Sequence, residues 1–339
     1  MHISIKTPSR LHFGFMDLSG DLGRRYGSVG VALDNPNTVL EVRKSRRLLI
    51  HNGNEQKIRD VVRAFSEHYG LTVGAEINVI QRIPEHSGLG SGTQLSLAVF
   101  MALAKLYNIQ TAPIDILRVT GRGARSGIGI GAFEKGGFIL DSGQRRGSGN
   151  EPLQPSAVIL RHPFPDDWYF VIVIPEKEKL ISGAKESAAL KKAAPSIKLS
   201  EEICRLILMN LLPALYEKDI EVFGRTLTEI DRRNGMFFQN AQGGMYTAKM
   251  ADAILEGLME AGAHGAGQSS WGPGIYGLAK KEHSGKVAKH MNELLRKDHI
   301  SAAVLISSCN TNGARIQVKA MDNFSLNSDS SSFPDLPMD

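Results

Sequence analysis

Apolar and polar residues alternate in short runs through the first hundred positions, a pattern typical of half-buried strands. The runs are rich in β-branched and aromatic residues and are bounded by Gly, Pro and Asn. Two stretches have a helical repeat instead, and the second places Leu95, Val99 and Leu106 on one face. The pattern predicts strands at 2–7, 10–15, 28–34, 38–44 and 75–81 and helices at 55–69 and from about 89 to 108.

Helical periodicity dominates the second half of the chain, with breaks expected at Pro213, Asn234 and Gly243. A short helix near 113–121 and a glycine-rich segment at 121–147 precede it. The predicted helices span 199–215, 218–230, 244–262 and 283–297, and the predicted strands span 138–140, 158–160, 169–174, 274–279, 302–307 and 314–319. Helices and strands are mixed along the whole chain, which predicts an α+β fold.

A chain of 339 residues is too long for one ordinary core, so two domains are expected. Prolines follow the glycine-rich segment between 150 and 166, which predicts a first domain at 1–160 and a second at 161–320. The last stretch, 321–339, is acidic, rich in serine and without period, which predicts a disordered tail.

The composition indicates a folded protein, because 42% of the residues are hydrophobic. The formal net charge is +5, and residues 320–339 contain four Asp but no Lys or Arg, so the body before them is more basic than the whole chain. A basic body could bind nucleic acid or an anionic metabolite, and net charge alone does not choose between them.

Cys204 and Cys309 are the only cysteines and lack metal-ligand spacing, so neither a disulfide framework nor a structural metal is expected. The N-terminus has no signal-like apolar region, and the longest apolar stretch, 206–215, is interrupted by Asn210 and Pro213. These features predict a soluble cytoplasmic protein without a membrane span.

A glycine-rich turn between a predicted strand and a predicted helix is the strongest chemical signal. Residues 84–94 read PEHSGLGSGTQ, so backbone N–H groups and a helix N-terminus converge where no Cβ blocks a close approach. The alternative is an ordinary turn with Ser91 or Thr93 as helix N-cap. The spacing excludes a Walker A loop and a Rossmann fingerprint. The expected anion cradle, for phosphate, consists of Gly88, Leu89, Gly90, Ser91, Gly92 and Thr93.

A second glycine-rich segment, 121–129, reads GRGARSGIG and contains too much glycine to predict a regular helix. Arg122 and Arg125 could point together at a phosphate or carboxylate, with Ser126 as a further binding residue. The alternative is a pair of surface arginines.

A third small-residue segment, 262–273, reads GAHGAGQSSWGP. Gln268, Ser269 and Ser270 offer hydrogen-bonding groups, and Trp271 offers a flat face on which an aromatic ring could stack. The alternative is that Trp271 anchors the core beside a turn.

Charged residues also gather near the N-terminus. Arg10 and His12 share one face of the predicted strand, Asp17 lies just beyond it, and Arg24 and Arg25 follow. The segment would bring a cation, an imidazole and a carboxylate together. The alternative is a solvated strand face with a structural histidine.

The 84–93 turn resembles the second motif of the GHMP small-molecule kinases, Pro-x-x-x-Gly-Leu-Gly-Ser-Ser-Ala, with Gly92 for the second Ser and Thr93 for Ala. The third segment is similar to the late glycine-rich loop of that family. Where the kinases commonly read Ser-Gly-Ile-Asp, with an Asp that activates the attacking hydroxyl, this chain has Gly129. A glycine cannot accept a proton, which weakens the kinase interpretation.

Together, RLHFGFMD, GLGSGTQ, GRGARSGIG, GGFILDSG and GQSSWGP resemble one branch of this superfamily, the β-ribofuranosylaminobenzene 5′-phosphate synthases. The resemblance implies a ribosomal-protein-S5-like first domain with a left-handed crossover and a ferredoxin-like second domain. It also implies the joining of phosphoribosyl pyrophosphate to 4-aminobenzoate or 4-hydroxybenzoate. CO2 and pyrophosphate leave and a C–C bond forms, early in the synthesis of methanopterin-type cofactors.

This resemblance and the motifs suggest hypothetical roles. The 88–93 cradle would bind pyrophosphate or phosphate with Mg²⁺, and Asp17 would bind the metal or the ribose or stabilise positive charge at the ribose C1. Ser269, Ser270 and Trp271 would line the benzoate pocket. The residues expected to be catalytic are Asp17, Arg24 and Arg125, and the further residues expected to bind substrate are Arg10, His12, Arg25, Arg122, Ser126 and Gln268.

Two other functions stay open at this point. A GHMP kinase of a small hydroxylated metabolite would need another carboxylate, such as Asp141 or Asp17. A non-catalytic anion or nucleic-acid binder could use the basic body, but aromatic and basic residues are not interleaved. Small-molecule substrates are therefore expected as partners, without nucleic acid or membrane, and a homodimer is left open.

Overall fold

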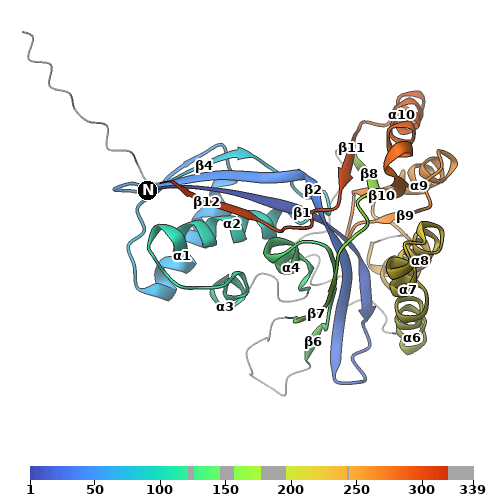
Figure 1. Cartoon of the computed structure of the whole chain (residues 1–339), viewed down its shortest axis with the longest axis horizontal. Coiled ribbons are helices and arrows are strands. Elements are labelled where there is room, and N and C mark those ends of the chain that lie inside the picture. The colour runs from blue at the N-terminus through green and yellow to red at the C-terminus, as the bar shows by residue number, and fades with distance from the viewer. Residues whose placement is uncertain (121–125, 146–155, 177–195, 243, 320–339) are drawn as a thin grey trace, which may run out of the picture.

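Two β-sheets form the frame of the molecule (Figure 1). The computed structural model describes residues 1–120, 126–145, 156–176, 196–242 and 244–319. Within these residues the larger sheet has eight strands: β1 (His2–Asp17), β2 (Arg24–Lys44), β3 (Leu49–His51), β4 (Ala75–Gln81), β5 (Phe138–Asp141), β6 (Gln144–Arg145), β7 (Val158–His162) and β12 (Arg315–Lys319). Its main path runs β12-β1-β2-β4-β3, while β5 and β6 also pair with β2 and β7 pairs with β5.

The smaller sheet is antiparallel and runs β11-β8-β10-β9. Its strands are β8 (Trp168–Pro175), β9 (Gly265–Gln268), β10 (Ile275–Lys280) and β11 (Ala302–Ser308). The first strand in the chain therefore lies between the fourth and the third, which is the strand order of a ferredoxin-like domain. The predicted α+β class, with a ferredoxin-like second part, is confirmed.

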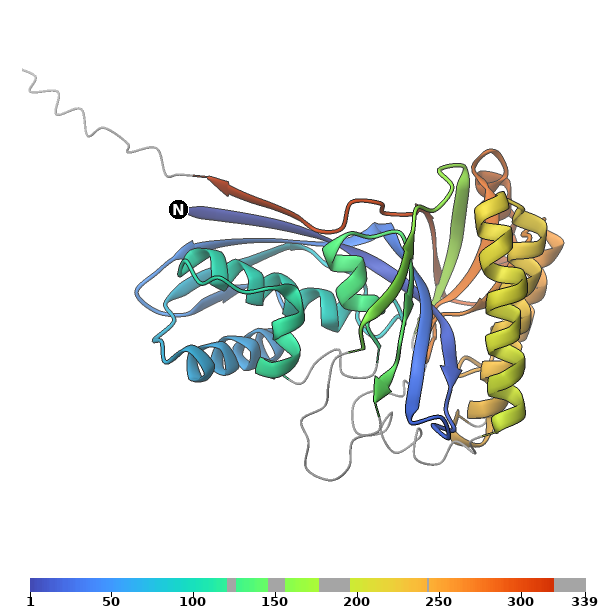
Figure 2. The same ribbon diagram turned by 60° about the horizontal axis from the view of Figure 1, so that its bottom comes forward.

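Helices cover the sheets in separate groups (Figures 1 and 2). The first group packs on the larger sheet and consists of α1 (Glu55–Tyr69), α2 (Ser91–Leu106), α3 (Ile116–Thr120), preceded by a 3₁₀ turn at Pro113–Asp115, and α4 (Ile128–Glu134). The second group comprises α6 (Ile197–Leu206), a π-helical turn (Ile207–Leu211), α7 (Leu212–Glu217), α8 (Ile220–Gln242), α9 (Ala251–Glu260) and α10 (Lys281–Lys297). In the part of the chain that is described, no helix combines the length and the apolar character needed to cross a membrane.

Two long strands replace the four short ones predicted for residues 2–44. The β1–β2 ladder continues through irregularities between Thr7 and Ser9 and between His12 and Gly14. Such bulges bend a strand pair without ending it. At Asn35, where the prediction places a break, the backbone N–H donates to the hydroxyl of Ser307 on β11 (3.0 Å). Strand β2 therefore continues because a second strand satisfies its backbone.

The helix boundaries in the second half also differ from the prediction. Helix α8 runs through Asn234, because this side chain bonds the backbone of β1 and so compensates for its low helix propensity. Helix α9 begins at Ala251 rather than at 244, because the N–H and hydroxyl of Thr247 are both bonded to Gln268 Oε1 (3.0 and 2.8 Å). The preceding turn therefore stays out of the helix.

Three further segments were assigned wrongly from the sequence. Residues 128–134 form α4 despite their glycines, and residues 265–268, expected to be a loop, form β9. The strand expected at 314–319 was placed in the second half, but as β12 it pairs with β1 and completes the larger sheet. The expected disordered tail, 321–339, lies outside the described residues.

One apolar core joins the two sheets. Its buried side chains come from the far half of β1, from the face of β8 that carries Phe170, and from α6 and α8. The opposite face of β8, with Val171 and Val173, packs on α9 and α10. Because each buried Phe or Ile contributes roughly 1.5–3 kcal/mol, this shared core fixes the end of β1 against α8.

Asn234 should contribute strongly to the stability of the contact between β1 and α8. Its Oδ1 accepts the Phe15 N–H (2.8 Å), and its Nδ2 donates to the Phe15 and Ile230 carbonyls (3.3 and 3.1 Å). Asn234→Ala leaves buried backbone groups unpaired and should lower the free energy of unfolding by about 2–4 kcal/mol. Denaturant unfolding measures the loss. Asn292→Ala is the control, because Asn292 makes the same bond to the carbonyl four residues back (2.9 Å) at an exposed position of α10. Equal losses of unfolding free energy in the two variants would contradict this role of Asn234.

Candidate active site

Three of the predicted motifs meet at the side chain of Ser269, which is fully buried. Its hydroxyl accepts the N–H of His12 (3.1 Å) and donates to the carbonyl of Gly88 (2.7 Å). The Ser270 N–H donates to the His12 carbonyl (3.0 Å), and the Gly274 N–H donates to the Ser87 carbonyl (3.1 Å). Strand β1, the turn before α2 and the turn after β9 therefore form one unit.

The expected anion cradle is closed on one side by this contact. Gly88 and Gly90 have φ of +76° and +83°, and a Cβ on Gly88 would lie 2.3 Å from the Ser269 carbonyl oxygen. Gly90 is the N-cap of α2 and makes no side-chain cap bond, so Ser91 and Thr93 are not caps but first-turn residues. They are partly exposed, and first-turn N–H groups have no partner within the helix. An anion can reach this helix end.

Arg10 lies against the cradle. Its backbone N–H donates to the Leu89 carbonyl (3.1 Å), and its guanidinium donates to the carbonyl of Gly88. A Cβ on Gly90 would lie 3.1 Å from Arg10 Cγ, so the side chain passes directly over that glycine. A cation and a helix N-terminus therefore adjoin, which suits a phosphate group.

Two of the three departures from the kinase pattern, Thr93 and Gly129, touch each other. Gly129 lies in α4, where an added Cβ would be 2.9 Å from Thr93 Cγ2, and the Gly129 carbonyl accepts from Gln94 Nε2 (2.8 Å). Thr93 thus occupies the space that a side chain at 129 would need. Position 129 has neither a carboxylate nor room for one.

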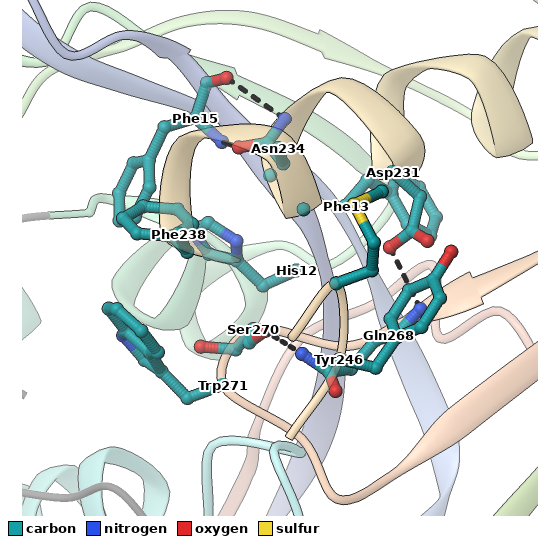
Figure 3. Close-up of a pocket in the computed structure, with 13 residues that line it drawn as sticks. His12, Phe13, Phe15, Asp231, Asn234, Phe238, Tyr246, Gln268, Ser270 and Trp271 are labelled. Atoms are coloured by element: carbon teal, nitrogen blue, oxygen red, sulfur yellow. Dashed lines mark hydrogen bonds between the residues drawn. The ribbon is translucent and has the colours of Figure 1, made fainter. Parts of the chain in front are cut away.

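A pocket that opens to solvent lies on the other side of the 268–271 segment (Figure 3), and its empty space, including the open mouth, is about 410 Å³. Phe15, Phe238 and Trp271 line one side, and the rings of Phe238 and Trp271 are 4.6 Å apart. Trp271 is only 7% exposed, so it is part of the core, and it also lines the pocket. Such aromatic faces can hold an aromatic ligand.

The opposite side of the pocket is polar, and sequence reasoning missed it. Asp231, on α8, accepts the Gln268 N–H (2.9 Å), and Tyr246 lines the same side (Figure 3). Burial raises the pKa of Asp231 to about 7, although the Gln268 N–H and Tyr246 oppose the rise. Burial and the nearby Asp231 also raise the pKa of Tyr246. An apolar helix face interrupted by a lone Asp was the available sequence signal.

His12 lies between the aromatic and polar sides (Figure 3). Its ring packs edge-on against Phe15, with ring centroids 4.9 Å apart. Burial, and next the charge of Arg10, lower the pKa of His12 to about 3, so the imidazole is neutral at physiological pH. Its Nδ1 is buried without a hydrogen-bond partner among the described residues. A ligand group in the pocket could supply one.

Asp17, Arg24 and Arg25 lie at the hairpin end of β1 and β2, outside this pocket. Asp17 is two residues beyond Phe15, which corresponds to about 7 Å along a strand. The guanidinium of Arg24 donates to Ser142, through its backbone oxygen and its hydroxyl (both 3.0 Å). Arg25 donates to the Leu18 carbonyl (2.9 Å). The predicted charged residues therefore form two groups rather than one.

Asp17 stays ionised in this environment. Burial alone would raise its pKa, but hydrogen bonds from the hydroxyls of Ser19 (2.7 Å) and Ser200 (2.8 Å) and from backbone N–H groups lower it below its ordinary value. These bonds all go to Oδ1. No group of three His, Cys, Asp or Glu side chains able to hold a metal occurs among the described residues.

Asp141, the other carboxylate considered for a kinase, has a structural role. It is fully buried, and its oxygens accept the N–H groups of Gly127 and Gly143 (both 2.8 Å), with the Ser126 hydroxyl at 3.4 Å. Burial raises its pKa. Ser126 therefore serves this loop contact, while Arg122 and Arg125 lie outside the described residues.

Comparison with known proteins identifies the class. The GHMP kinases N terminal domain matches residues 56–137, and the GHMP kinases C terminal domain matches residues 211–297. Lactococcus lactis galactokinase has the same fold, with a TM-score of 0.67 and 13% identity over 93% of this chain and 95% of its own. Homoserine kinase from Cytophaga hutchinsonii has a TM-score of 0.66 and 19% identity over 93% and 97%. The fold is that of the GHMP superfamily.

Closer relatives define the branch. The β-ribofuranosylphenol 5′-phosphate synthase of Methanocaldococcus jannaschii is 34% identical over 92% of this chain and 99% of its own. The synthase of the same name from Methanothermobacter thermautotrophicus is 34% identical over 87% and 94%. The chain belongs to this enzyme family, which confirms the branch predicted from the motifs.

The contact between Gly129 and Thr93 can be tested by a double-mutant cycle. Gly129→Asp forces a carboxylate against Thr93 in a buried site and should lower the free energy of unfolding by about 2–3 kcal/mol. Thr93→Ala should recover part of this loss, with a coupling energy of about 1 kcal/mol in denaturant unfolding. Gly285→Asp is the control, because Gly285 is also helical but has open space around it. Additive effects of the two substitutions would contradict a shared volume.

Proposed function

We propose that the enzyme joins phosphoribosyl pyrophosphate to a para-substituted benzoate, with 4-hydroxybenzoate as the preferred acceptor. The C–O bond between the ribose C1 and pyrophosphate breaks, the benzoate C1 forms a bond to the ribose C1, and the carboxylate leaves as CO2. The relatives are named as synthases of a ribofuranosylphenol, and this phenol supports 4-hydroxybenzoate over 4-aminobenzoate as the acceptor. The family resemblance supports a place in methanopterin-type cofactor synthesis, and the presence of only two cysteines favours a cytoplasmic transferase.

The observation that carries the proposal is the shared wall of the cradle and the pocket. Ser269 bonds Gly88 of the cradle, while its neighbours Gln268, Ser270 and Trp271 line the pocket. A phosphorylated donor on the cradle and an aromatic acceptor in the pocket would therefore meet at this segment. Holding two reactants in line can supply about 7–11 kcal/mol of the barrier.

The charged residues would serve the donor. Arg10 and the first turn of α2 would hold the leaving pyrophosphate, whose charge grows as the C–O bond breaks. Arg24, Arg25 and Asp17, at the hairpin end, would bind a more distant part of the donor, the ribose or its 5-phosphate. Mg²⁺ would neutralise phosphate charge, held mainly by phosphate oxygens because this ion needs few protein ligands.

Several observations weigh against the alternative of a kinase. Gly129 offers no base, Asp141 is engaged by backbone N–H groups, and Asp17 lies at the hairpin end. The relatives that are kinases are also more distant, since homoserine kinase of Methanococcus maripaludis is 22% identical over 78% of the chain. Phosphoryl transfer from ATP to a metabolite is thus disfavoured.

Product release tests the reaction. With phosphoribosyl pyrophosphate, Mg²⁺ and 4-hydroxybenzoate, the purified protein should release CO2 and pyrophosphate in equal amounts, and 4-aminobenzoate should react more slowly. Labelled carboxylate and a pyrophosphate assay measure the two products. No release with either acceptor would refute the proposal, and phosphorylation by ATP would favour the kinase.

A glycine pair tests the cradle. Gly88→Ala places a Cβ 2.3 Å from the Ser269 carbonyl oxygen, whereas Gly70, with φ +63°, has nothing within 4 Å. Both variants bear the strain of positive φ, but only Gly88→Ala displaces the cradle, and it should lower kcat/KM for the donor by about 100-fold. Gly70→Ala should stay within about twofold. Full activity of folded Gly88→Ala would exclude the cradle as the donor site.

A further inference from the structure

We propose that Asp231 is the catalytic base for the acceptor: its carboxylate bonds the para hydroxyl of the benzoate and takes that proton as the C–C bond forms. This inference rests on the proposed function. It deepens the proposal by assigning the para end of the acceptor to one side of the pocket.

The carboxyl of Asp231 is buried and lines the pocket, as expected for a residue that binds a ligand. The side chain is 5% exposed and lines the pocket (Figure 3). One oxygen, Oδ1, accepts the Gln268 N–H, while Oδ2 is buried and makes no hydrogen bond of standard geometry with the described residues, although the Tyr246 side chain lies near enough to lower the pKa of the carboxyl. A buried carboxylate oxygen without a partner is costly, so a donor from the ligand would stabilise it. A para hydroxyl supplies such a donor.

Tyr246, Tyr276 and His12, the titratable groups nearest Asp231, are neutral at physiological pH. Tyr246 approaches from the turn after α8, Tyr276 from β10 and His12 from β1, while β9 contributes the uncharged Gln268. Burial and Asp231 raise the pKa of Tyr276 and of Tyr246, and the pKa of His12 is lowered. Arg232 and Asp252 act on Tyr246 and have opposite charges. No cation among the described residues is a cause of the pKa of Asp231, so its carboxylate is basic enough to accept a proton near pH 7.

The ends of the pocket orient the acceptor. His12 and Ser270 are bonded to each other through the backbone and adjoin Ser269, which contacts the cradle. The benzoate C1, which must reach the donor, therefore belongs at this end. Asp231 lies on the side of the pocket across from the aromatic residues (Figure 3). A para substituent directed away from the donor would reach it.

The step balances without another reactant. As the phenolic proton moves to Asp231, electrons from oxygen enter the ring and the benzoate C1 forms its bond to the ribose C1, giving a cyclohexadienone that still carries the carboxylate. The bond to the carboxylate then breaks, its electrons restore the aromatic ring, and CO2 leaves. The dienone oxygen takes the proton back from Asp231. Because the carboxylate adjoins neutral His12 rather than a tight cationic clamp, its loss is not opposed.

Kinetics of Asp231→Asn test the role. Loss of the general base should lower kcat by about 100-fold or more. The KM for 4-hydroxybenzoate should change only a few-fold, because Asn has the shape of Asp and keeps a hydrogen-bonding group. Wild-type activity should rise with pH through about 7, as Asp231 loses its proton, and this limb should disappear in Asp231→Asn. Asp231→Glu should retain a limb at reduced kcat. Asp166→Asn, an exposed control, should match the wild type.

Stability gives a readout besides activity. A carboxyl whose pKa rises from 3.8 to about 7 on folding favours the folded state when protonated, and this stabilisation is lost as pH rises through that window. The melting temperature of the wild type should therefore fall relative to Asp231→Asn between about pH 4 and pH 8.

The possible outcomes separate the two proposals. Failure of the wild type to release CO2 and pyrophosphate with either acceptor would overturn the reaction and the role of Asp231 with it. Turnover by the wild type, with Asp231→Asn keeping the same kcat and the same acid limb, would overturn only the role of Asp231. Loss of the acid limb together with the kcat-specific defect, restored in part by Asp231→Glu, would support it.

Discussion

The buried hydroxyl of Ser269 is the contact on which the rest of the site depends. It accepts a hydrogen bond from the N–H of His12 and donates one to the carbonyl of Gly88, so it ties together segments that lie far apart in the sequence. Neither segment can move without leaving a buried polar group unpaired, at a cost of about 1–3 kcal/mol. The contact also explains Gly88, because any Cβ there would collide with the carbonyl of Ser269. One side chain thus fixes the distance between the cradle and the pocket.

That fixed distance matters because the two sides of the 268–271 segment have different chemistry. The cradle side has Arg10 and the N-terminus of α2, and the pocket side has aromatic rings, uncharged polar groups and the carboxyl of Asp231. An enzyme that separates charge at a phosphorylated donor and transfers the carbocation to an aromatic ring needs both environments, close together but not mixed. The core shared by β1, β8 and α8 holds them in this relation.

The sequence predicted much of the fold and the glycine-rich turn before α2, because these depend on local patterns. Helix α1 was predicted with its observed bounds, and the GLGSG turn precedes α2 as expected. The continuity of β1 and β2 and the place of β12 depend on which strands pair, and no local pattern records that. Asp231 was missed for a similar reason. Its place on the apolar face of α8 was a weak local signal, and only the packing of β9 and Tyr246 around it buries it and raises its pKa.

The same reasoning bears on how this fold supports chemistry other than phosphoryl transfer. In the kinases that the motifs resemble, the carboxylate at the position of Gly129 belongs to the cradle side, where it can activate a hydroxyl beside a phosphate. Here Thr93 fills that space, and the carboxyl with a pKa near 7 is Asp231, in the pocket across the 268–271 segment. A base on that side cannot serve a hydroxyl on the cradle, but it can draw a proton from the far end of an aromatic acceptor. Moving the titratable group to the other side of the 268–271 segment would change which substrate is activated, while the glycine-rich turn before α2 stays in place.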